Sequence, residues 1–394
     1  MIPSRLLKIF APIVFLIILV GSYFLFIQTS DDQSHRDNEE TLITISNLAK
    51  ADLKIFKAGK NLAGASEIII TASALWLPPG NYFLSAATKQ VTLYFPIVLS
   101  GFQSGPDEDG TFNITIRPFP KEYPPILSDD SPAFRYIPSG NFLLGDRQNP
   151  REPHHVWLTG YFIAEFEVTN KEFRAFLHDR NGYDDDANWS EQGLKWKKNN
   201  PSHATALLLE SDGDYERFGR DALPVVWTTW FEANAYCKWL TKKIGNGRWL
   251  YALPTDAEWE KAARGPDNFD YALGMQISDE EIPHYNWKKN PDAVQPMFSL
   301  VESRAKFTPN RYGLYHMTGN ASEWSQSVNK AFSRSQPYAD DDHNLDRANG
   351  LRTIRGGSWY SASIAYLYIP YRDAFQPEHC NQESGFRVVA KLLP

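Results

Sequence analysis

The chain has 394 residues, 42% of them hydrophobic and 14% aromatic, which is enough apolar mass for two or three domains. Its formal net charge is −7, and the sequence has no cluster of Lys and Arg that could bind phosphates. Nucleic acid is therefore not an expected partner. Its two cysteines, Cys237 and Cys380, are too few for a disulfide scaffold or a zinc site built on thiolates.

The first 30 residues have the pattern of a membrane anchor. Arg5 and Lys8 precede an apolar run whose core, 9–27, has no charged residue. About 20 helical residues span the hydrocarbon layer, and this run is longer than the apolar part of a cleavable signal peptide. We therefore predict a cytoplasmic stub and one transmembrane helix in residues 1–30, with the following domains exported to the periplasm or the cell exterior. A cleaved signal peptide is the alternative.

A short all-β region is expected next. Residues 31–40 are a polar tether, and residues 41–118 contain short β-rich runs separated by turn residues, which is typical of a small β-sandwich. The runs lie at 41–46, 53–57, 67–71, 82–86, 90–95 and 112–117. Residues 77–82, with a Pro-Gly turn before a Tyr, resemble the turn of PEGA-type surface β-domains; an unrelated β-spacer is the alternative. Residues 119–130 are rich in proline and predict a stiff linker.

The next region contains three sequence motifs that are typical of helix N-termini. Each is a Thr-x-x-Glu capping box, in which the Thr side chain accepts from the third amide while the Glu reaches back to the Thr amide. The boxes begin at Thr169, Thr229 and Thr255. The second helix has Cys237 on its apolar face, where a free cysteine behaves as a small hydrophobe. Long stretches rich in Gly, Asn and Trp between the helices indicate an irregular α+β fold.

Residues 131–394 contain a series of short motifs in a recognisable order. The main ones are Ile137-Pro138-Ser139-Gly140, Glu167-Val168-Thr169-Asn170, Leu253-Pro254-Thr255, Gly319-Asn320, Glu323-Trp324, Arg355-Gly356-Gly357-Ser358-Trp359 and Gly385-Phe386-Arg387. Together these motifs resemble the formylglycine-generating enzyme, or sulfatase-modifying factor, family. The resemblance implies an irregular α+β domain like that of C-type lectins, preceded here by the β-sandwich and the transmembrane helix.

The resemblance also implies a copper site that this sequence does not reproduce. Oxidases of the family hold copper with two cysteines a few residues before the arginine matched by Arg372. Here residues 360–371 contain no Cys, His or Met, which are the donors that copper(I) prefers. Cys380 lies beyond Arg372 beside His379, and two adjacent ligands rarely suffice for a metal site. We therefore expect no copper and no formylglycine-generating activity of the usual kind.

Calcium is the other cofactor that the resemblance implies. One family site uses groups matched by His316, Gly319, Ala321 and Glu323, and a second begins at positions matched by Asn286 and Trp287. Calcium prefers carboxylate and carbonyl oxygens, so the imidazole of His316 replaces a suitable donor with a poor one. Calcium binding at one of these sites is one interpretation, and hydrogen bonding within the loop is the other.

The segment between Gly357 and Gly385 floors the substrate groove in the family. In this chain it is rich in aromatic residues, with arginines nearby, a combination suited to a peptide, a protein or a glycan. The candidate ligand residues are Trp359, Tyr360, Tyr366, Tyr368, Tyr371, Arg372 and Arg387, with Phe375 adjacent. Packing of these rings in the core is the alternative for about half of them.

Our leading hypothesis is a membrane-anchored, non-catalytic binding or assembly module. Two alternatives stay open at this point. One is an oxidase of the formylglycine-generating type with a different metal arrangement. The other is a variable lectin-like receptor, because such receptors end in a similar segment.

Overall fold

The computed structural model describes most of the chain from residue 41 onward. The described residues are 41–47, 50–68, 74–89, 91–99, 111–116, 120–147, 154–204, 218–276, 308–329 and 350–393. The predicted anchor and tether lie outside them. Among the described residues, no helix has both the length and the apolar character that a membrane span needs.

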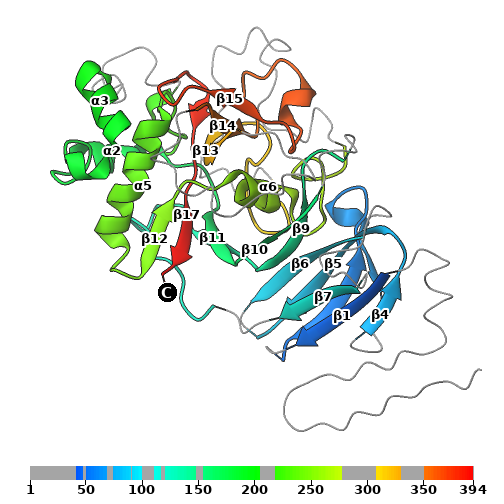
Figure 1. Ribbon diagram of the computed structural model, residues 1–394. Coiled ribbons are helices and arrows are strands. Elements are labelled where there is room, and N and C mark those ends of the chain that lie inside the picture. The colour runs from blue at the N-terminus through cyan, green and yellow to red at the C-terminus, as the bar shows by residue number, and fades with distance from the viewer. Residues whose placement is uncertain are drawn as a thin grey trace, which may run out of the picture.

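The N-terminal unit is made of two sheets that face each other (Figure 1). One has the order β4-β1-β7, and the other, with all neighbours antiparallel, has the order β3-β2-β5-β6. Its elements are β1 (Thr41–Asn47), β2 (Asp52–Lys57), the short 3-10 helix η1 (Leu62–Gly64), β3 (Ser66–Ile68), β4 (Ala74–Leu77), β5 (Gly80–Ala87), β6 (Thr92–Leu99) and β7 (Thr111–Ile116). The core between the sheets is aliphatic and aromatic.

Strand β6 differs from its prediction in length. The expected run ended at residue 95, whereas β6 continues to Leu99 through Pro96, which lies opposite Phe83. Because β6 is the last strand of its sheet, the missing amide proton of proline costs no hydrogen bond to a further strand. The edge position therefore explains why the proline does not end the strand.

Within its described residues, the C-terminal domain combines short strands with four α-helices. The strands are β8 (Phe134–Ile137), β9 (Gly140–Leu144), β10 (His154–Leu158), β11 (Tyr161–Ala164), β12 (Trp249–Ala252), β13 (Ser322–Val328), β14 (Arg352–Arg355), β15 (Asp373–Phe375), β16 (Ser384–Gly385) and β17 (Val389–Leu392). The helices are α2 (Asn170–His178), α3 (Glu191–Asn199), α5 (Trp230–Ile244) and α6 (Asp256–Arg264), with the 3-10 helices η2 (Asp186–Asn188) and η8 (Ile364–Leu367).

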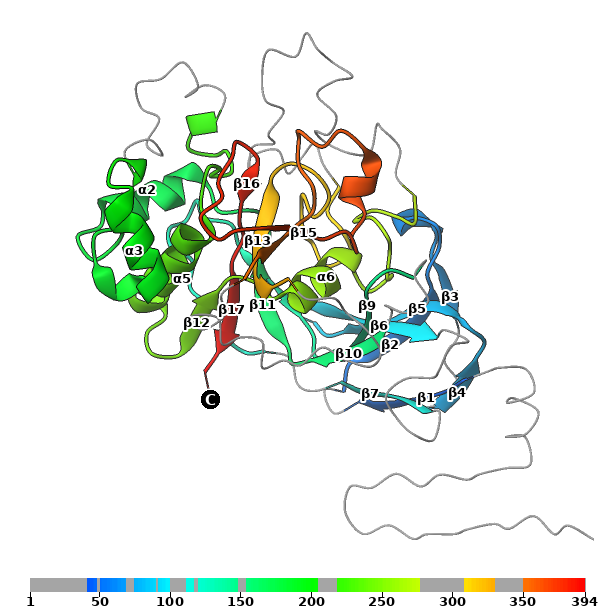
Figure 2. The ribbon, with the colours of Figure 1, turned by 45° about the horizontal axis from the view of Figure 1, so that its top comes forward.

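The sheet β12-β17-β11-β8 separates two hydrophobic clusters. Because neighbouring strand residues point to opposite faces, Phe162 and Val388 face the cluster that contains α5. Ile163 and Val389 face the cluster that contains α6. A second sheet, β15-β14-β13-β16, lies near α6 (Figure 2). The domain is thus a mixed α/β structure in which helices α5 and α6 flank a twisted sheet.

All three predicted capping boxes are present. Thr169, Thr229 and Thr255 each accept from the amide of the glutamate three residues on, and each glutamate reaches back to its threonine. Helix α5 is capped at its end by Gly245, and Cys237 is buried on it, as the periodicity predicted. These boxes fix the residues at which α2, α5 and α6 begin. The start of α6 in turn positions the α6 residues Asp256, Glu260 and Arg264, which are described below.

The two units are in direct contact. Strands β6 and β9 lie side by side (Figure 1), and the amide of Met275 donates to the carbonyl of Lys60 over 2.9 Å. The guanidinium of Arg311 binds both oxygens of Asp267, donates to the carbonyl of Leu62, and lies over the ring of Phe83. The β-sandwich is therefore joined to the C-terminal domain by hydrogen bonds as well as by apolar packing.

The proline-rich linker is bound to the C-terminal domain along its second half. The ring of Tyr123 packs edge-on against Phe162, and the hydroxyl of Tyr251 donates to the carbonyl of Pro125 over 2.6 Å. Leu127 packs against the α5 cluster. Physically, the residues from Tyr123 onward belong with the C-terminal domain, a few residues earlier than the expected boundary at 131.

A candidate ligand face and the charges beneath it

The candidate face begins at a tight turn after β14. Gly356 and Gly357 have φ values of 90° and 65°, in the left-handed region that favours glycine. A Cβ on Gly357 would lie 2.8 Å from the carbonyl oxygen of Tyr366 and 2.6 Å from the side chain of Leu367. Glycine at this position therefore allows the segment around η8 to fold back over the turn.

The predicted aromatic residues divide between surface and core. Tyr360 is 39% exposed and Tyr366 is 42% exposed. The half-buried Tyr371 meets Tyr366 edge-on, with 5.3 Å between ring centroids. Trp359, by contrast, is buried beside Phe218 and donates to the carbonyl of Gln382. Tyr360 and Tyr366 are therefore exposed and Tyr371 is half-buried, and we call these three residues the tyrosine face.

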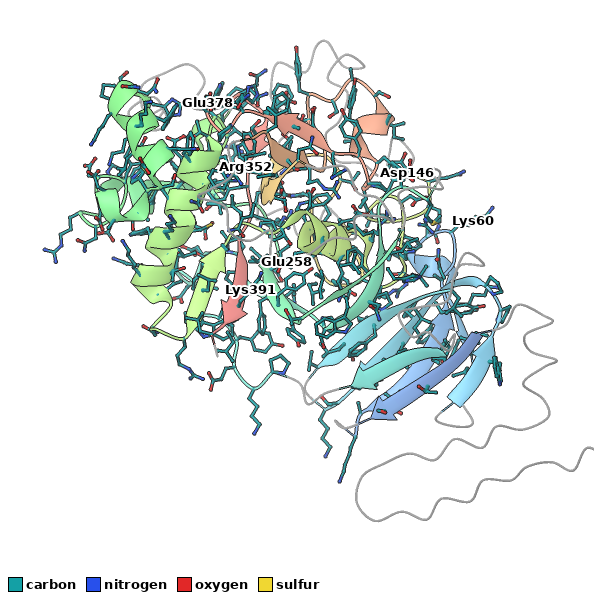
Figure 3. All side chains as sticks on the ribbon, viewed as in Figure 1. Lys60, Asp146, Glu258, Arg352, Glu378 and Lys391 are labelled. Carbon is teal, nitrogen blue, oxygen red and sulfur yellow. The ribbon has the colours of Figure 1, made fainter. Side chains whose placement is uncertain are left out.

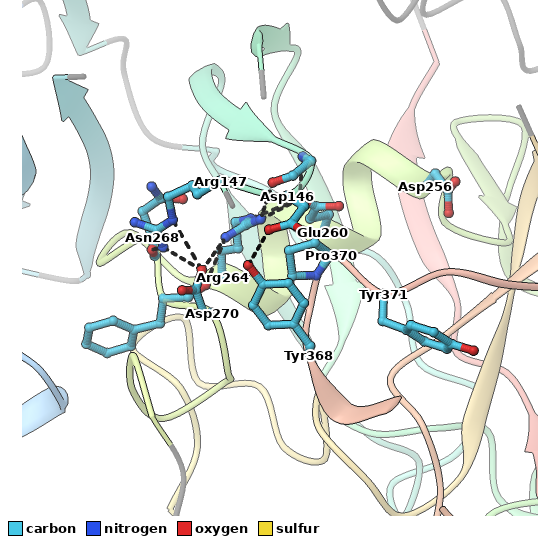
Figure 4. Close-up of polar contacts among 12 residues, drawn as sticks. Asp146, Arg147, Asp256, Glu260, Arg264, Asn268, Asp270, Tyr368, Pro370 and Tyr371 are labelled. Atoms are coloured by element: carbon cyan, nitrogen blue, oxygen red, sulfur yellow. Dashed lines mark hydrogen bonds and ion pairs between the residues drawn. The ribbon is translucent and has the colours of Figure 1, made fainter. Parts of the chain in front are cut away.

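Tyr368 differs from the residues of the tyrosine face in its contacts. Its hydroxyl donates to Asp146 over 2.7 Å (Figure 4). Its ring packs against that of Tyr271. Burial, together with the hydrogen bond to Asp146, raises the pKa of this phenol. Tyr368 is therefore held as a neutral donor, and it ties the C-terminal segment to the loop after β9.

The two candidate arginines lie in different places. Arg372 is partly buried and its Nη1 lies 3.5 Å from Oδ2 of Asp256, the first residue of α6. Arg387 is completely buried, so the expectation that it faces a ligand does not match its position. Both oxygens of Glu323 accept from its guanidinium, each over 2.6 Å. The guanidinium also donates to the carbonyls of Ala164, Glu165 and Tyr315, so the side chain is directed into the domain and not toward the surface.

Phe375 and His379 close the far side of the segment. Their rings stack at 4.2 Å with an interplanar angle of 10°. The ring of Phe375 also packs against the α5 cluster. His379 is thus a packing partner of Phe375, next to Cys380, in the loop that leads to β16.

A buried ionic network underlies the face, and nothing in the sequence patterns predicted it. Glu260 on α6 accepts from Arg264 over 2.9 Å and from Arg355 over 2.5 Å. Arg264 also forms an ion pair with Asp270, and Asp270 forms a second ion pair with Arg147 (Figure 4). Burial opposes ionisation of Glu260, but the two arginines outweigh it and lower its pKa. The spacing of Glu260 and Arg264, four residues apart on a helix, was the one local signal available.

The side chains available do not fit a copper site of the oxidase kind. Cys237 is buried in α5, and burial raises the pKa of its thiol. Burial and the nearby Glu232 also raise the pKa of Cys380. Copper binding needs thiolates, which a raised pKa disfavours. Residues 360–371 themselves offer hydroxyls, phenols and aliphatic groups.

Only one of the two candidate calcium positions lies within the described residues. Asn286 and Trp287 lie outside the described residues. At the other position, both oxygens of Glu323 already accept from Arg387, and one also accepts from Nε1 of Trp259 over 2.8 Å. The Nδ1 atom of His316 lies 3.2 Å from Glu167. Across the residues that the structure describes, no group of three or more His, Cys, Asp or Glu side chains is placed to hold a metal ion.

Two buried carboxylates, Glu167 and Glu323, lie beside this loop. Burial opposes ionisation of Glu167, but His316 and Arg387 outweigh it and hold its pKa below the ordinary value. Burial raises the pKa of Glu323 despite Arg387, and the nearby charge of Glu167 adds to this. The amide of Asn320 donates to Glu167 over 2.8 Å. The two acids therefore compete for the same guanidinium.

Gly319 and Ala321 lie within this loop, and the amide of Gly319 donates to the carbonyl of Gly356.

The fold and the site define a class: an irregular α/β domain whose loops are held by buried arginines, glutamates and tryptophans. The model of the sulfatase-modifying factor enzyme 1-like domain matches residues 124–392. The chain belongs to this family. The start of the match at residue 124 agrees with the packing of the linker on the C-terminal domain.

Relatives in this family include enzymes and a protein described as inactive. The chain is 28% identical to the formylglycine-generating enzyme of Mus musculus, over 66% of this chain and 75% of that protein. It is 27% identical to the inactive C-alpha-formylglycine-generating enzyme 2 of Mus musculus, over 65% of this chain and 85% of that protein. It is 28% identical to the serine/threonine-protein kinase pkn1 of Chlamydia caviae, but spans only 37% of that protein.

Solved structures with a similar fold have TM-scores below 0.5. Treponema denticola variable protein 1 has a TM-score of 0.47 and 22% identity, covering 65% of this chain and 94% of its own. PvdO from Pseudomonas aeruginosa has a TM-score of 0.45 and 21% identity, covering 67% of this chain and 96% of its own. The assignment to the family rests on the sequence match and not on these structures.

Proposed function

We propose that this protein is a non-catalytic member of its family that binds a peptide, a protein or a glycan on the tyrosine face. Its N-terminal segment anchors it in a membrane, with the β-sandwich as the spacer between membrane and binding domain. The PEGA-like turn at residues 77–82 is consistent with such a surface role.

The observation that supports the loss of oxidase chemistry most directly is the position of the two thiols. One is enclosed in helix α5 and the other follows Arg372, and the pKa of each is raised. The segment in which the oxidases hold copper presents Tyr360 and Tyr366 to solvent instead. A relative described as inactive, 27% identical, is compatible with this proposal.

The tyrosine face supports the binding role. The exposed rings of Tyr360 and Tyr366, the second of which meets Tyr371 edge-on, offer flat apolar area with hydrogen-bonding edges. Tyrosines of this kind lose little conformational entropy when a ligand covers them. The neighbouring Arg372 supplies a donor, and Asp256 holds it in place.

Oxidase activity is tested directly by mass. The purified chain is incubated with copper, oxygen and a Cys-x-Pro-x-Arg peptide, and the peptide is weighed. We expect an unchanged mass. A loss of about 18 Da, which is the change from thiol to aldehyde, would establish the oxidase alternative and contradict the proposal.

Binding is tested with arrays of peptides and of glycans, probed with the wild-type chain and two variants. Tyr366→Ala should reduce binding of any retained ligand about tenfold or more, since one stacked ring contributes at least ~1.4 kcal/mol at the centre of an interface. Trp157→Ala is the matched control, because Trp157 is also an exposed aromatic residue and lies on β10, away from the face. Equal effects of both variants would contradict a ligand site on the tyrosine face.

A further inference from the structure

Residues 265–276, which follow helix α6 and which we call the bridging loop, contact both the β-sandwich and the segment that carries the tyrosine face. The loop belongs to the C-terminal domain by sequence. Its contacts with the sandwich come from its two ends, and its contacts with the ligand segment come from its middle. The loop is therefore a physical connection between two parts of the molecule that are far apart in sequence.

The first end of the bridging loop is bound to the sandwich through Arg311. The guanidinium of Arg311 donates to the two oxygens of Asp267 over 2.8 and 2.9 Å, and to the carbonyl of Leu62 over 3.0 Å. It also lies 4.4 Å from the ring centre of Phe83, a buried residue of β5. Asp267 is 1% exposed, and a buried carboxylate is strongly destabilising without its positive partner. The ion pair therefore fixes the loop against the sandwich.

The second end of the bridging loop meets the backbone of the sandwich at Gly274. Gly274 forms an antiparallel bridge with Asn61, and the amide of Met275 donates to the carbonyl of Lys60 over 2.9 Å. A Cβ on Gly274 would lie 2.8 Å from the carbonyl oxygen of Lys60, so the backbone would have to move. The absence of a side chain at this position allows the two backbones to approach each other.

The middle of the bridging loop holds the segment of the tyrosine face. The carbonyl of Asp270 accepts from the amide of Ile369 over 2.9 Å, and the ring of Tyr271 packs against that of Tyr368 with 5.8 Å between centroids. The amide of Tyr371 in turn donates to the carbonyl of Tyr368 over 2.7 Å. The loop thus supports a turn that ends at one residue of the tyrosine face.

We propose that the β-sandwich is a structural part of the ligand site as well as a spacer: it fixes the bridging loop through Arg311 and Gly274, and the loop fixes the turn at residues 368–371. Arg311 is then a positioning residue for the tyrosine face. The consequence for ligand binding rests on the proposed function, whereas the consequence for the shape of the turn does not.

The turn also has support from inside the C-terminal domain. The Nη1 atom of Arg355 donates to the carbonyl of Tyr371 over 3.1 Å, and Ile369 is completely buried in the cluster that contains α6. Loss of the contacts with the sandwich should therefore loosen the turn without unfolding the domain.

Hydrogen exchange of the full-length chain tests the proposal in the peptide covering residues 366–372, where the amides of Ile369 and Tyr371 report the turn. Gly274→Ala should raise exchange there about fivefold or more, a factor that corresponds to one hydrogen bond. Gly64→Ala is the matched control, because a Cβ on Gly64 would lie 3.4 Å from its nearest listed neighbours, which is ordinary contact. Equal exchange of the turn in both variants would overturn the proposal.

Variants of Arg311 show whether the effect is local. Arg311→Ala should raise exchange in the bridging loop and in the turn, and should leave the peptide of helix α5 unchanged. Arg311→Lys keeps the charge but loses the two parallel hydrogen bonds to Asp267, so its exchange should lie between those of the wild type and the alanine variant. Equal acceleration in every peptide, α5 included, would mean that Arg311 supports global stability only, and its positioning role would be refuted.

Binding separates this inference from the proposed function. For a peptide or glycan whose retention on the arrays needs Tyr366, Gly274→Ala should weaken binding about fivefold, because a loosened site must be ordered again, and Gly64→Ala should not. If both glycine variants bind such a ligand equally, the inference fails and the proposed function stands. If no array ligand depends on Tyr366, the proposed function fails, and exchange of the turn still decides the inference.

Discussion

The two domains of this protein stabilise their interiors in different ways. Every buried position in the core of the β-sandwich is apolar except Ser85, as far as the described residues extend. The C-terminal domain instead buries whole charged side chains, among them Glu232, Glu260, Arg264 and Arg387. Glu258 and Lys391, both labelled in Figure 3, form another ionic contact of the C-terminal domain.

The cause lies in the regularity of the backbone. In the sandwich, neighbouring strands satisfy most backbone groups. The C-terminal domain has long loops, whose carbonyls need other donors. Arg387 donates to the carbonyls of Ala164, Glu165 and Tyr315, and Lys261 to those of Pro138 and Gly140. Buried charge in this domain therefore completes the hydrogen bonding of an irregular chain.

The largest expected effect comes from removing Arg387. Arg387→Met takes the guanidinium away from two buried glutamates and removes one hydrogen-bond donor from each of three carbonyls, so we expect a loss of about 3–5 kcal/mol of unfolding free energy. Tryptophan fluorescence in urea reports this domain, because all tryptophans but Trp76 follow residue 131.

The control for this variant is Arg248→Met. Arg248 is exposed and pairs with an exposed Glu122, so its loss should change stability by less than about 0.5 kcal/mol. Similar losses from both variants would mean that the buried guanidinium has no special role, and the contrast between the domains would lose its basis.

A smaller effect is expected in the sandwich. Ile55 is completely buried, opposite Leu84 in the register of β2 and β5. Ile55→Val should cost about 1 kcal/mol, seen as faster hydrogen exchange in β2 and β5, with little change in the tryptophan transition. Thr92→Ala, at an exposed position, serves as control. An equal shift of the tryptophan transition would show that the two cores unfold as one unit.

The smallest effect concerns a surface charge. Asp179 caps α2 and binds Lys243 and Trp239 on α5, and the hydrogen bond to Lys243, followed by others, lowers its pKa to about 2. Because the pKa of Asp179 is lower in the folded chain than in the unfolded chain, the ionised side chain stabilises the fold at pH values above its ordinary pKa. This stabilisation is lost as the pH falls toward 2. Asp179→Asn should therefore cost ~0.3 kcal/mol at pH 6 and less at pH 2.5, by urea midpoint. A difference that does not vary with pH would contradict the charge pairing.

Prediction from the sequence worked best where the signal was local. The three capping boxes depend on residues a few positions apart, and they are present. The predicted runs of the sandwich each overlap a strand, whereas β4 lies in none of them. The extent of β6 was missed because a proline is tolerated only at a sheet edge, and the edge is a property of the whole sheet.

The candidate site was predictable only in part. The composition of residues 358–372 indicated an aromatic surface, but which rings are exposed depends on the turn at Gly357 and on the pocket that buries Trp359. The place of Arg387 inside the domain could not be read from its neighbours in the sequence. Its partner Glu323 lies 64 positions away.

The sequence by itself determined the family, the helix starts and the loss of thiols from the segment where the oxidases bind copper, because each of these depends on residue identity over short distances. Only the tertiary structure decided which charges are buried and what they bind. Glu167, His316 and Arg387 meet because strands and loops from distant parts of the chain converge on one point.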